Sequence, residues 1–121
     1  MIRVRLQLIL SLGPLVACAH SSSAMNQEGA VQASYVWGPE VNTMKPCGSD
    51  STFWVLAKHE IIGRLRTAHD SLRTRPYDRI FIKVQGQRST QPTDGFADET
   101  NGYFEVTEIL EVRPLRHGEC V

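Results

Sequence analysis

The chain has 121 residues, which is enough for one domain. Hydrophobic residues make up 41% and charged residues 21%, so the composition is that of a globular protein and not of a disordered one. The 13 basic and 13 acidic side chains give a formal net charge of zero, which argues against a nucleic-acid partner because such a partner requires a basic face.

The first 17 residues, MIRVRLQLILSLGPLVA, have the layout of a secretory signal peptide. Two arginines form a positive segment, a short apolar run follows, and Cys18 comes directly after a small residue. The apolar run is shorter than the roughly 20 residues of a transmembrane helix. A short buried helix is the alternative, and Pro14 disfavours it. We therefore expect residues 1–17 to be removed, which leaves 11 basic and 13 acidic side chains and a net charge of about −2.

Residues 15–18, with the sequence LVAC, resemble the lipobox of bacterial lipoproteins. The resemblance implies cleavage before Cys18, a diacylglyceryl thioether on its sulfur and an acylated amino terminus. Several acyl chains, at about 0.8 kcal/mol per buried CH₂, make a stable membrane anchor. The residue after the cysteine is Ala19 and not Asp, which resembles the pattern of Gram-negative lipoproteins sorted to the outer membrane. We expect a lipid-anchored domain in the periplasm or at the cell surface.

Residues 18–33 are predicted to be the lipidated cysteine and a flexible tether, because the stretch is small and polar with little to bury. The folded domain is predicted over residues 34–121. It starts with an aromatic strand at 34–44, bent or bulged at its Gly-Pro pair. A turn at 45–50 and a second strand at 51–57 follow.

Apolar residues then recur at helical spacing over residues 61–72, and a proline four residues later is expected to end this helix. Two more strands are predicted at 78–87 and 103–113, with a long polar loop at 88–102 between them. In the last strand Ile109 falls out of phase, so we expect a bulge near Glu108. The apolar residues that share the other phase are Phe104, Val106, Leu110 and Val112.

Strands that flank one helix in fewer than 90 residues predict a mainly β fold, a small closed β-barrel with the helix packed across one end. A barrel of this size has a thin core. Cys47 in a turn and Cys120 at the far end of the sequence are predicted to form a disulfide, with two buried free thiols as the alternative. Closing a loop of roughly 70 residues contributes about 4 kcal/mol in the chain-entropy model. With Cys18 lipidated, all three cysteines are then explained.

Three segments together resemble the C-terminal OB-fold domain of NlpE-type envelope lipoproteins: YVWGPEVNTMKPCGSDSTFWV, LRTRPYDRIFIKVQGQ and GYFEVTEILEVRP. The likeness covers residues 35–121 and lies in the order of the elements. It implies an OB-like barrel of about five strands. Full-length relatives carry an N-terminal domain with a C-x-x-C pair, tied to copper and envelope stress. This chain has no C-x-x-C, so we do not carry those roles over.

The sequence lacks the common catalytic motifs G-x-S-x-G, H-E-x-x-H and C-x-x-C, and we predict that the protein is not an enzyme. His59, His69 and His117 do not have the spacing of metal ligands. The acids of the 88–102 loop do not match a calcium-binding pattern. We therefore predict no metal site and no cofactor.

The candidate contact surface combines the loop from Ser89 to Asn101 with the arginine-bearing exit of the helix, because loops carry function more often than strands do. The aromatic residues of the first two strands are assigned to the core and rim of the barrel. The candidate contact residues are Arg75, Tyr77, Asp94, Phe96 and Asp98.

The predicted function is that of a non-catalytic outer-membrane lipoprotein. Its domain either binds an envelope protein partner or supports the envelope. Two alternatives remain open: a carrier of a small ligand or a metal such as copper, and an inhibitor of a host or rival enzyme.

Overall fold

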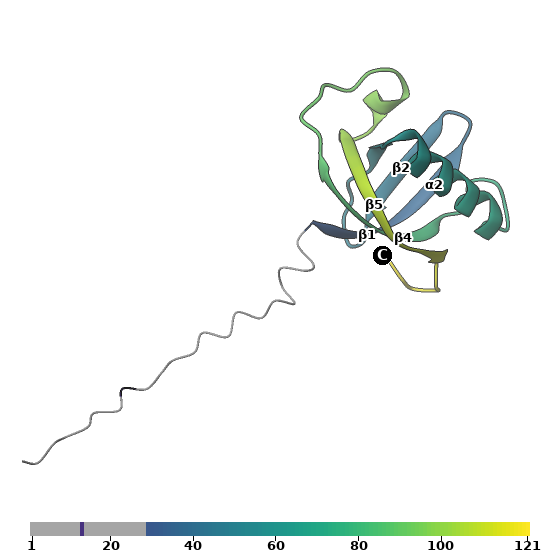
Figure 1. Ribbon diagram of the computed structural model, residues 1–121. Helices are drawn as coiled ribbons and strands as arrows, with labels where there is room; N and C mark the ends of the chain where they lie inside the picture. The colour runs from purple at the N-terminus through teal and green to yellow at the C-terminus, as the bar shows by residue number, and fades with distance from the viewer. Residues whose placement is uncertain (1–12, 14–28) are drawn as a thin grey trace, which may run out of the picture.

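The computed structural model describes residue 13 and residues 29–121, and it places a closed five-stranded β-barrel within them (Figure 1). The predicted leader, Cys18 and most of the predicted tether lie outside the described residues. In chain order the elements are β1 (Ala30–Gly38), β2 (Val41–Pro46), β3 (Phe53–Leu56), α2 (His59–Leu72), β4 (Ile80–Arg88), the 3-10 helix η1 (Gly95–Glu99) and β5 (Tyr103–Pro114).

The strands follow one another around the barrel in the order β1-β2-β3-β5-β4, and β4 pairs back onto β1. Neighbouring strands are antiparallel except for β3 and β5, which run parallel. Helix α2 connects β3 to β4. This is an OB-like arrangement, and it confirms the predicted fold class. Full closure leaves no strand edge exposed to pair with another chain.

The first strand differs from the prediction in two ways. It begins at Ala30, and Ala33 is fully buried between Pro46 of β2 and Ile82 of β4, so residues 30–33 belong to the barrel and not to a tether. The predicted single strand at 34–44 is a hairpin, β1 and β2, whose turn contains the proline. Proline has no N–H to give to a ladder, so the chain reverses there.

The core of the barrel is filled by inward side chains from all five strands and by one face of α2. Leu65 and His69 of the helix are fully buried. Of these two, Leu65 lies on the predicted apolar face. The helix ends at Leu72, before the proline that was expected to stop it. The other core residues are Tyr35, Met44, Phe53, Val55, Ile80, Ile82, Val84, Phe104 and Val106, together with Ala33.

Strand β5 has two irregularities opposite β4, one on each side of Glu108, and this confirms the predicted bulge. The register skips Leu110, which is 41% exposed, while Ile109 packs against the core. The predicted phase of Leu110 was therefore wrong, because the bulge moves its side chain to the outside. Close to the second irregularity, a Cβ on Gly86 would lie 2.0 Å from the backbone oxygen of Glu105, so only glycine allows this approach.

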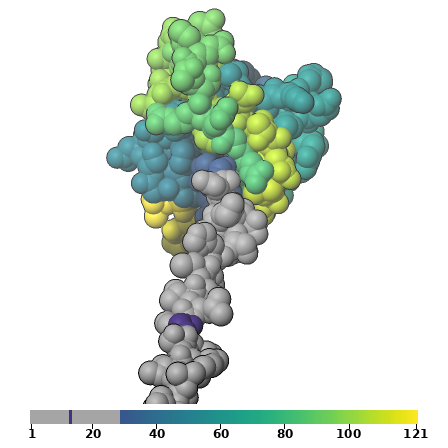
Figure 2. Space-filling model, turned by 60° about the vertical axis from the view of Figure 1, so that its left-hand side comes forward, coloured from purple at the N-terminus to yellow at the C-terminus, as the bar shows by residue number. Residues whose placement is uncertain are grey.

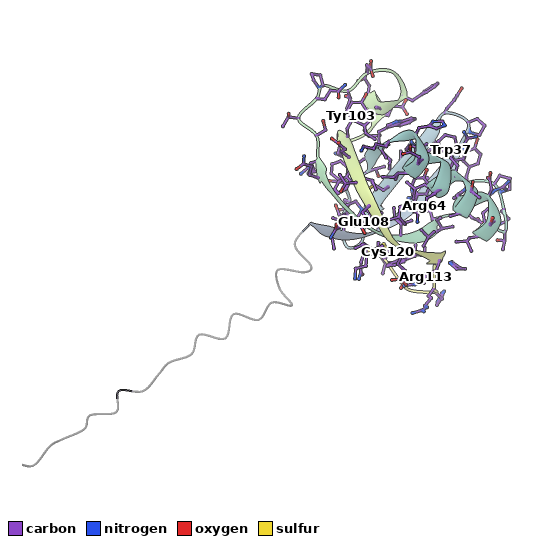
Figure 3. All side chains as sticks on the ribbon, in the orientation of Figure 1. Trp37, Arg64, Tyr103, Glu108, Arg113 and Cys120 are labelled. Carbon is purple, nitrogen blue, oxygen red and sulfur yellow. A yellow bond between two sulfur atoms is a disulfide. The ribbon has the colours of Figure 1, made fainter. Side chains whose placement is uncertain are left out.

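The predicted disulfide between Cys47 and Cys120 is present, with the sulfur atoms 2.03 Å apart. It ties the segment after β5 to the end of β2, and the Cys47 amide also donates a hydrogen bond to Gln32 of β1 at 2.9 Å. Arg113 holds the same segment through two hydrogen bonds to the Glu119 carboxylate, at 2.7 and 2.6 Å. This ion pair lowers the pKa of Glu119 to about 2, mainly through those hydrogen bonds. Figure 3 labels Arg113 and Cys120 in this part of the barrel.

Candidate functional site

A groove of about 440 Å³ opens between the β1–β2 turn and the β4–β5 loop. We call it the aromatic groove. Its lining includes Trp37 and Pro39 from the first hairpin, Trp54 from β3 and Phe96 from η1. Glu40 lies at the rim. The floor includes Asn42 and Val55.

The outward direction of the Trp54 side chain follows from the alternation of β3. Phe53 and Val55 point into the core, so Trp54 points outward. Its ring stacks on that of Phe96, with centroids 6.5 Å apart and planes 21° apart. Phe96 remains 58% exposed, which is unusual for so large an apolar side chain that is held in place.

Hydrogen bonds on both sides of η1 hold the segment that carries Phe96. Before η1, the Asp94 carboxylate accepts from the Tyr103 hydroxyl at 2.8 Å, and this bond raises the pKa of Tyr103. After η1, Asn101 both donates to the Thr52 carbonyl and accepts from the Thr52 amide, at 2.8 and 2.9 Å. The loop projects at the top of the barrel in Figure 2, in green, away from the yellow C-terminal segment.

A cation lies over the ring of Trp37. The Arg66 guanidinium lies 4.4 Å from the centroid of the Trp37 ring, close enough for a cation–π interaction. The same arginine is near the buried hydroxyl of Tyr35. Burial raises the pKa of Tyr35 strongly, and Arg66 opposes this rise only in part.

Asn42 holds the floor of the groove together where the ladder between β2 and β3 stops. That ladder contains only two residue pairs, Thr43 with Trp54 and Met44 with Phe53. One step further along, the Asn42 side-chain amide donates to the Val55 carbonyl at 3.2 Å. Its oxygen accepts from the Tyr35 hydroxyl at 2.6 Å. Both polar atoms of Asn42 are thus engaged inside the protein.

A second pocket, of about 340 Å³, lies on the other side of the β1–β2 turn. We call it the helix-exit pocket, formed by Asp70, Arg73 and Tyr77 together with Trp37 and Pro39. Because Trp37 and Pro39 line both pockets, they form a ridge between them.

Tyr77 stands directly against the ridge. A Cβ on Gly38 would lie 2.5 Å from Tyr77 Cε1, so the glycine allows the tyrosine ring to approach the turn. Tyr77 is itself 54% exposed and has a left-handed backbone, with φ of 63°.

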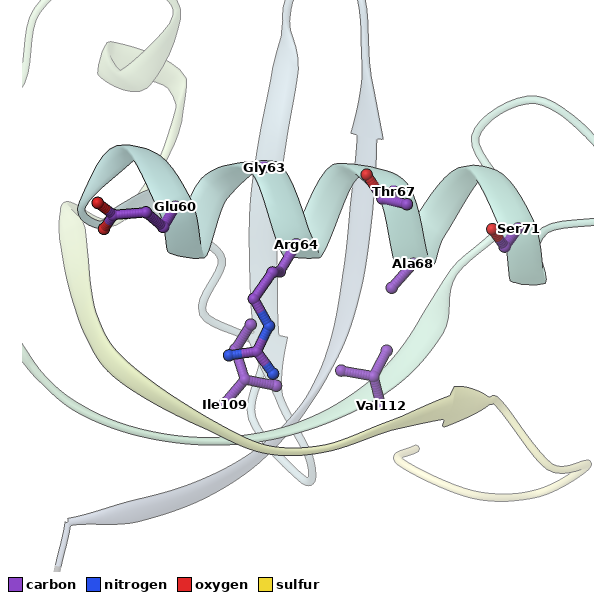
Figure 4. A pocket seen from close by; sticks show the side chains of 8 residues that line it. All are labelled: Glu60, Gly63, Arg64, Thr67, Ala68, Ser71, Ile109 and Val112. Atoms are coloured by element: carbon purple, nitrogen blue, oxygen red, sulfur yellow. The ribbon is translucent and has the colours of Figure 1, made fainter.

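Another pocket, of about 570 Å³, lies between α2 and β5 (Figure 4). Small side chains on the helix, among them Gly63 and Ala68, leave a gap above Ile109 and Val112. Figure 4 shows Arg64 reaching down beside Ile109. The cavity is wide but contains none of the exposed aromatic rings of the aromatic groove.

The structure distributes the predicted contact residues unevenly. Phe96 lies in the aromatic groove and Tyr77 in the helix-exit pocket, on the two sides of the ridge. Arg75 points away and forms an ion pair with Asp78 at 3.3 Å, whose pKa is lowered mainly by a hydrogen bond from Thr74. Asp94 is engaged with the tyrosine at the start of β5, and Asp98 is exposed on η1.

Sequence reasoning assigned Trp37 and Trp54 to the core and rim. Trp37 does pack against the core, but both side chains also line the aromatic groove, which was not predicted. A signal for Trp54 was present, because an inward Phe53 in an alternating strand predicts an outward neighbour. For Trp37 there was none, since its role depends on Phe96 arriving from a loop far along the chain.

Comparison of the chain with protein-family models, curated proteins and solved structures finds no match. The resemblance to NlpE-type domains therefore stays a prediction.

Among residue 13 and residues 29–121, no helix is both long and apolar enough to cross a membrane. Over the same part of the chain, no group of three or more His, Cys, Asp or Glu side chains is placed to hold a metal ion.

Proposed function

We propose that this chain is a non-catalytic, lipid-anchored outer-membrane protein that binds an envelope partner through the aromatic groove. The observation that carries the proposal is the exposed Phe96, stacked on Trp54 in a groove that Trp37 also lines. OB folds bind their ligands at the face of strands 2 and 3 and at the loops that flank it. The aromatic groove occupies the corresponding face, because β2, β3 and both loops contribute to it.

The chemistry of the lining favours binding over catalysis. The side chains that line the aromatic groove include no Ser, Thr, Cys, His or Lys, so the groove offers no hydroxyl, thiol or amine nucleophile and no histidine base. Its carboxylate, Glu40, has no second titratable group beside it in the lining. What the groove does offer is exposed aromatic surface, which is typical of binding hot spots.

The position of the groove fits an anchor on Cys18. Strand β1 runs from Ala30 to Gly38 (Figure 1), about 26 Å when extended, and Trp37 and Gly38 at its far end line the groove. A tether that enters at Ala30 therefore reaches the barrel on the side opposite the groove. With the lipid on Cys18, a flexible tether lets the groove turn away from the bilayer and toward a partner.

The test of the binding site is photo-crosslinking in cells that produce the full chain. A photoreactive residue is placed at Phe96 in one variant and at exposed Leu110 in a matched control. We expect a discrete crosslinked partner from position 96 and none from position 110. Equal products from both positions, or none from position 96, would reject the groove as the contact surface.

The anchor has a separate test in the same cells. Wild-type protein is expected in the outer-membrane fraction, and Cys18→Ala is expected to move it to the soluble fraction, because the thioether can no longer form. If Cys18→Ala stays in the outer membrane, the lipid anchor is wrong, whatever the crosslinking shows.

A further inference from the structure

The turn that forms the ridge has an unfavourable residue at its tightest position. Pro39 and Glu40 are its two central residues, and Glu40 has φ of 64°. A turn with proline first and a positive φ second is of type II, for which glycine or asparagine is the favoured second residue. Glutamate has no such preference, so the fold does not explain why it occupies this position.

The strain is not spread at random over the domain. Three non-glycine residues of the described chain have a positive φ: Glu40, Tyr77 and Cys120. Cys120 is held by its disulfide. The other two flank the same ridge, one at each pocket. Backbone strain of this kind gathers at functional sites, where the side chain it presents is needed.

The charges around the ridge leave Glu40 as the acid without a partner. In the helix-exit pocket, Asp70 and Arg73 form an ion pair at 3.5 Å. In the aromatic groove, Glu40 is exposed, and none of the ion pairs within residues 29–121 includes it. A ligand that fills the groove therefore finds a complementary charge if it places a cation beside Glu40.

We infer that the aromatic groove and the helix-exit pocket together bind an extended peptide segment, with one large apolar side chain in each pocket and a Lys or Arg beside Glu40. This rests on the proposed function and deepens it by naming the ligand class. Volumes of about 440 and 340 Å³ are near the low end for ligand sites, so each pocket suits a side chain or two. An extended backbone crosses the ridge between Trp37 and Pro39 and places side chains on both sides.

Two other ligand classes fit the groove less well. A nucleic acid brings phosphates toward Glu40, and the two like charges repel. A glycan brings hydroxyl groups that each need a hydrogen-bond partner. Asn42, the polar side chain of the floor, is already engaged with Tyr35 and Val55. Apolar side chains suit such a floor better than hydroxyl groups do.

The experiment uses the full chain, immobilised and exposed to a random dodecapeptide display library. The baits are the wild type, Glu40→Lys and Glu40→Asn, with Leu110→Ala as a matched surface control. Asparagine tolerates the left-handed turn and lacks the charge, so it separates charge from folding. Thermal melts confirm that each bait is folded.

We expect the wild type and Leu110→Ala to enrich peptides that combine large apolar residues with a nearby Lys or Arg. Glu40→Lys should enrich Asp or Glu in place of the basic residue while the apolar positions persist. A wild-type-selected peptide should bind Glu40→Asn about fivefold more weakly, as an exposed ion pair allows. It should bind Phe96→Ala about thirtyfold more weakly, the loss expected of an aromatic hot spot.

The outcomes that would contradict the inference differ in what they exclude. If Glu40→Lys enriches the same peptides as the wild type, or no bait enriches a consensus, the peptide inference is overturned. If chitotetraose binds the wild type and Phe96→Ala abolishes that binding, the ligand class is wrong while the groove remains the binding site. If selected peptides bind Phe96→Ala as tightly as the wild type, the groove itself is excluded and the proposed function falls with it.

Discussion

The two ends of the barrel are built in opposite ways. At one end, which we call the closure end, Gly86, Arg113, Glu119 and the Cys47–Cys120 disulfide fasten strands and the C-terminal segment together. At the other, the groove end, the residues Trp37, Glu40, Trp54, Tyr77 and Phe96 leave aromatic surface exposed and two backbone positions strained.

This contrast shows that the contacts that stabilise the barrel and the residues proposed to bind a partner lie at opposite ends of β1. Its first residues lie at the closure end, where Gly29 and Gln32 accept hydrogen bonds from Gly86 and Cys47. Its last residues form the ridge at the groove end. A rigid closure end lets the groove end keep local features that lower stability. The contrast predicts that the largest losses of stability come from changes at the closure end, whereas changes at the groove end cause smaller losses or gains.

The largest expected effect is the loss of the disulfide. Cys120→Ser opens a loop of 73 residues and should lower the free energy of unfolding by about 4 kcal/mol, because the unfolded chain regains that freedom. Urea unfolding of the full chain measures it. Cys47→Ser is the matched control and should give the same loss, since both remove one bond. A loss below about 1 kcal/mol would break the contrast between the two ends.

Next in size is Gly86→Ala, which places a Cβ 2.0 Å from the Glu105 backbone oxygen. The pairing of β4 with β5 must then shift, at a cost of about 3 kcal/mol. Gly63→Ala in α2 is the control, because no atom lies within 4 Å of the new Cβ. That change should stabilise the domain by up to about 1 kcal/mol through helix propensity. Equal thermal shifts for the two variants would contradict the prediction.

A middle-sized effect is expected at the floor of the groove. Asn42→Ala leaves the buried Tyr35 hydroxyl without its acceptor, which should cost about 2 kcal/mol. Adding Tyr35→Phe to that variant removes the unsatisfied hydroxyl, so the double variant should recover part of the loss. Chemical denaturation of the single and double variants measures this coupling. Strictly additive losses would mean that the two side chains do not depend on each other.

At the rim of the groove we expect a substitution that increases stability. Glu40→Gly relieves a left-handed glutamate and should stabilise the domain by about 1 kcal/mol, seen as a higher melting temperature. Glu40→Ala keeps the strain and loses the charge, so it should show no such gain. A lower melting temperature for Glu40→Gly would mean that the glutamate supports the fold, and the separation of the two ends would fail at this position.

The smallest expected effect is a loss of stability at low pH. The pKa of Glu119 is lowered from 4.5 to about 2 by Arg113, so the ionised form is favoured in the folded state. The resulting stability is complete above pH 4.5 and is lost as the pH falls toward 2. Glu119→Gln should therefore be less stable than the wild type at pH 6, with a difference that shrinks at pH 3. A difference that stays constant between the two pH values would rule out this ion pair as the source.

The sequence was sufficient to predict what depends on local patterns. The helical spacing over residues 61–72, the alternation from Ile80 to Val84 and the phase break at Ile109 each record which side of an element is buried. The disulfide followed from counting cysteines once Cys18 was assigned to the lipid. These features need no knowledge of which strands are neighbours.

What sequence reasoning missed depends on contacts between distant segments. Alternation runs unbroken across Gly38 and Pro39, so the hairpin turn looked like a bend in one strand. The aromatic groove forms because Trp37, Trp54 and Phe96 come from two strands and a loop that meet only in the closed barrel. Their spacing along the chain carries no such information.

The course of β1 has a mechanical consequence. A pull applied at Ala30 and resisted at the ridge acts along the length of this strand. From Ala30 to Gly38 every residue of β1 pairs with β2, β4 or both, and all of these pairs are antiparallel. Such a force shears the hydrogen bonds together instead of opening them one after another. A domain held by its N-terminal side and loaded at its groove thus resists force in the direction in which its sheet is strongest.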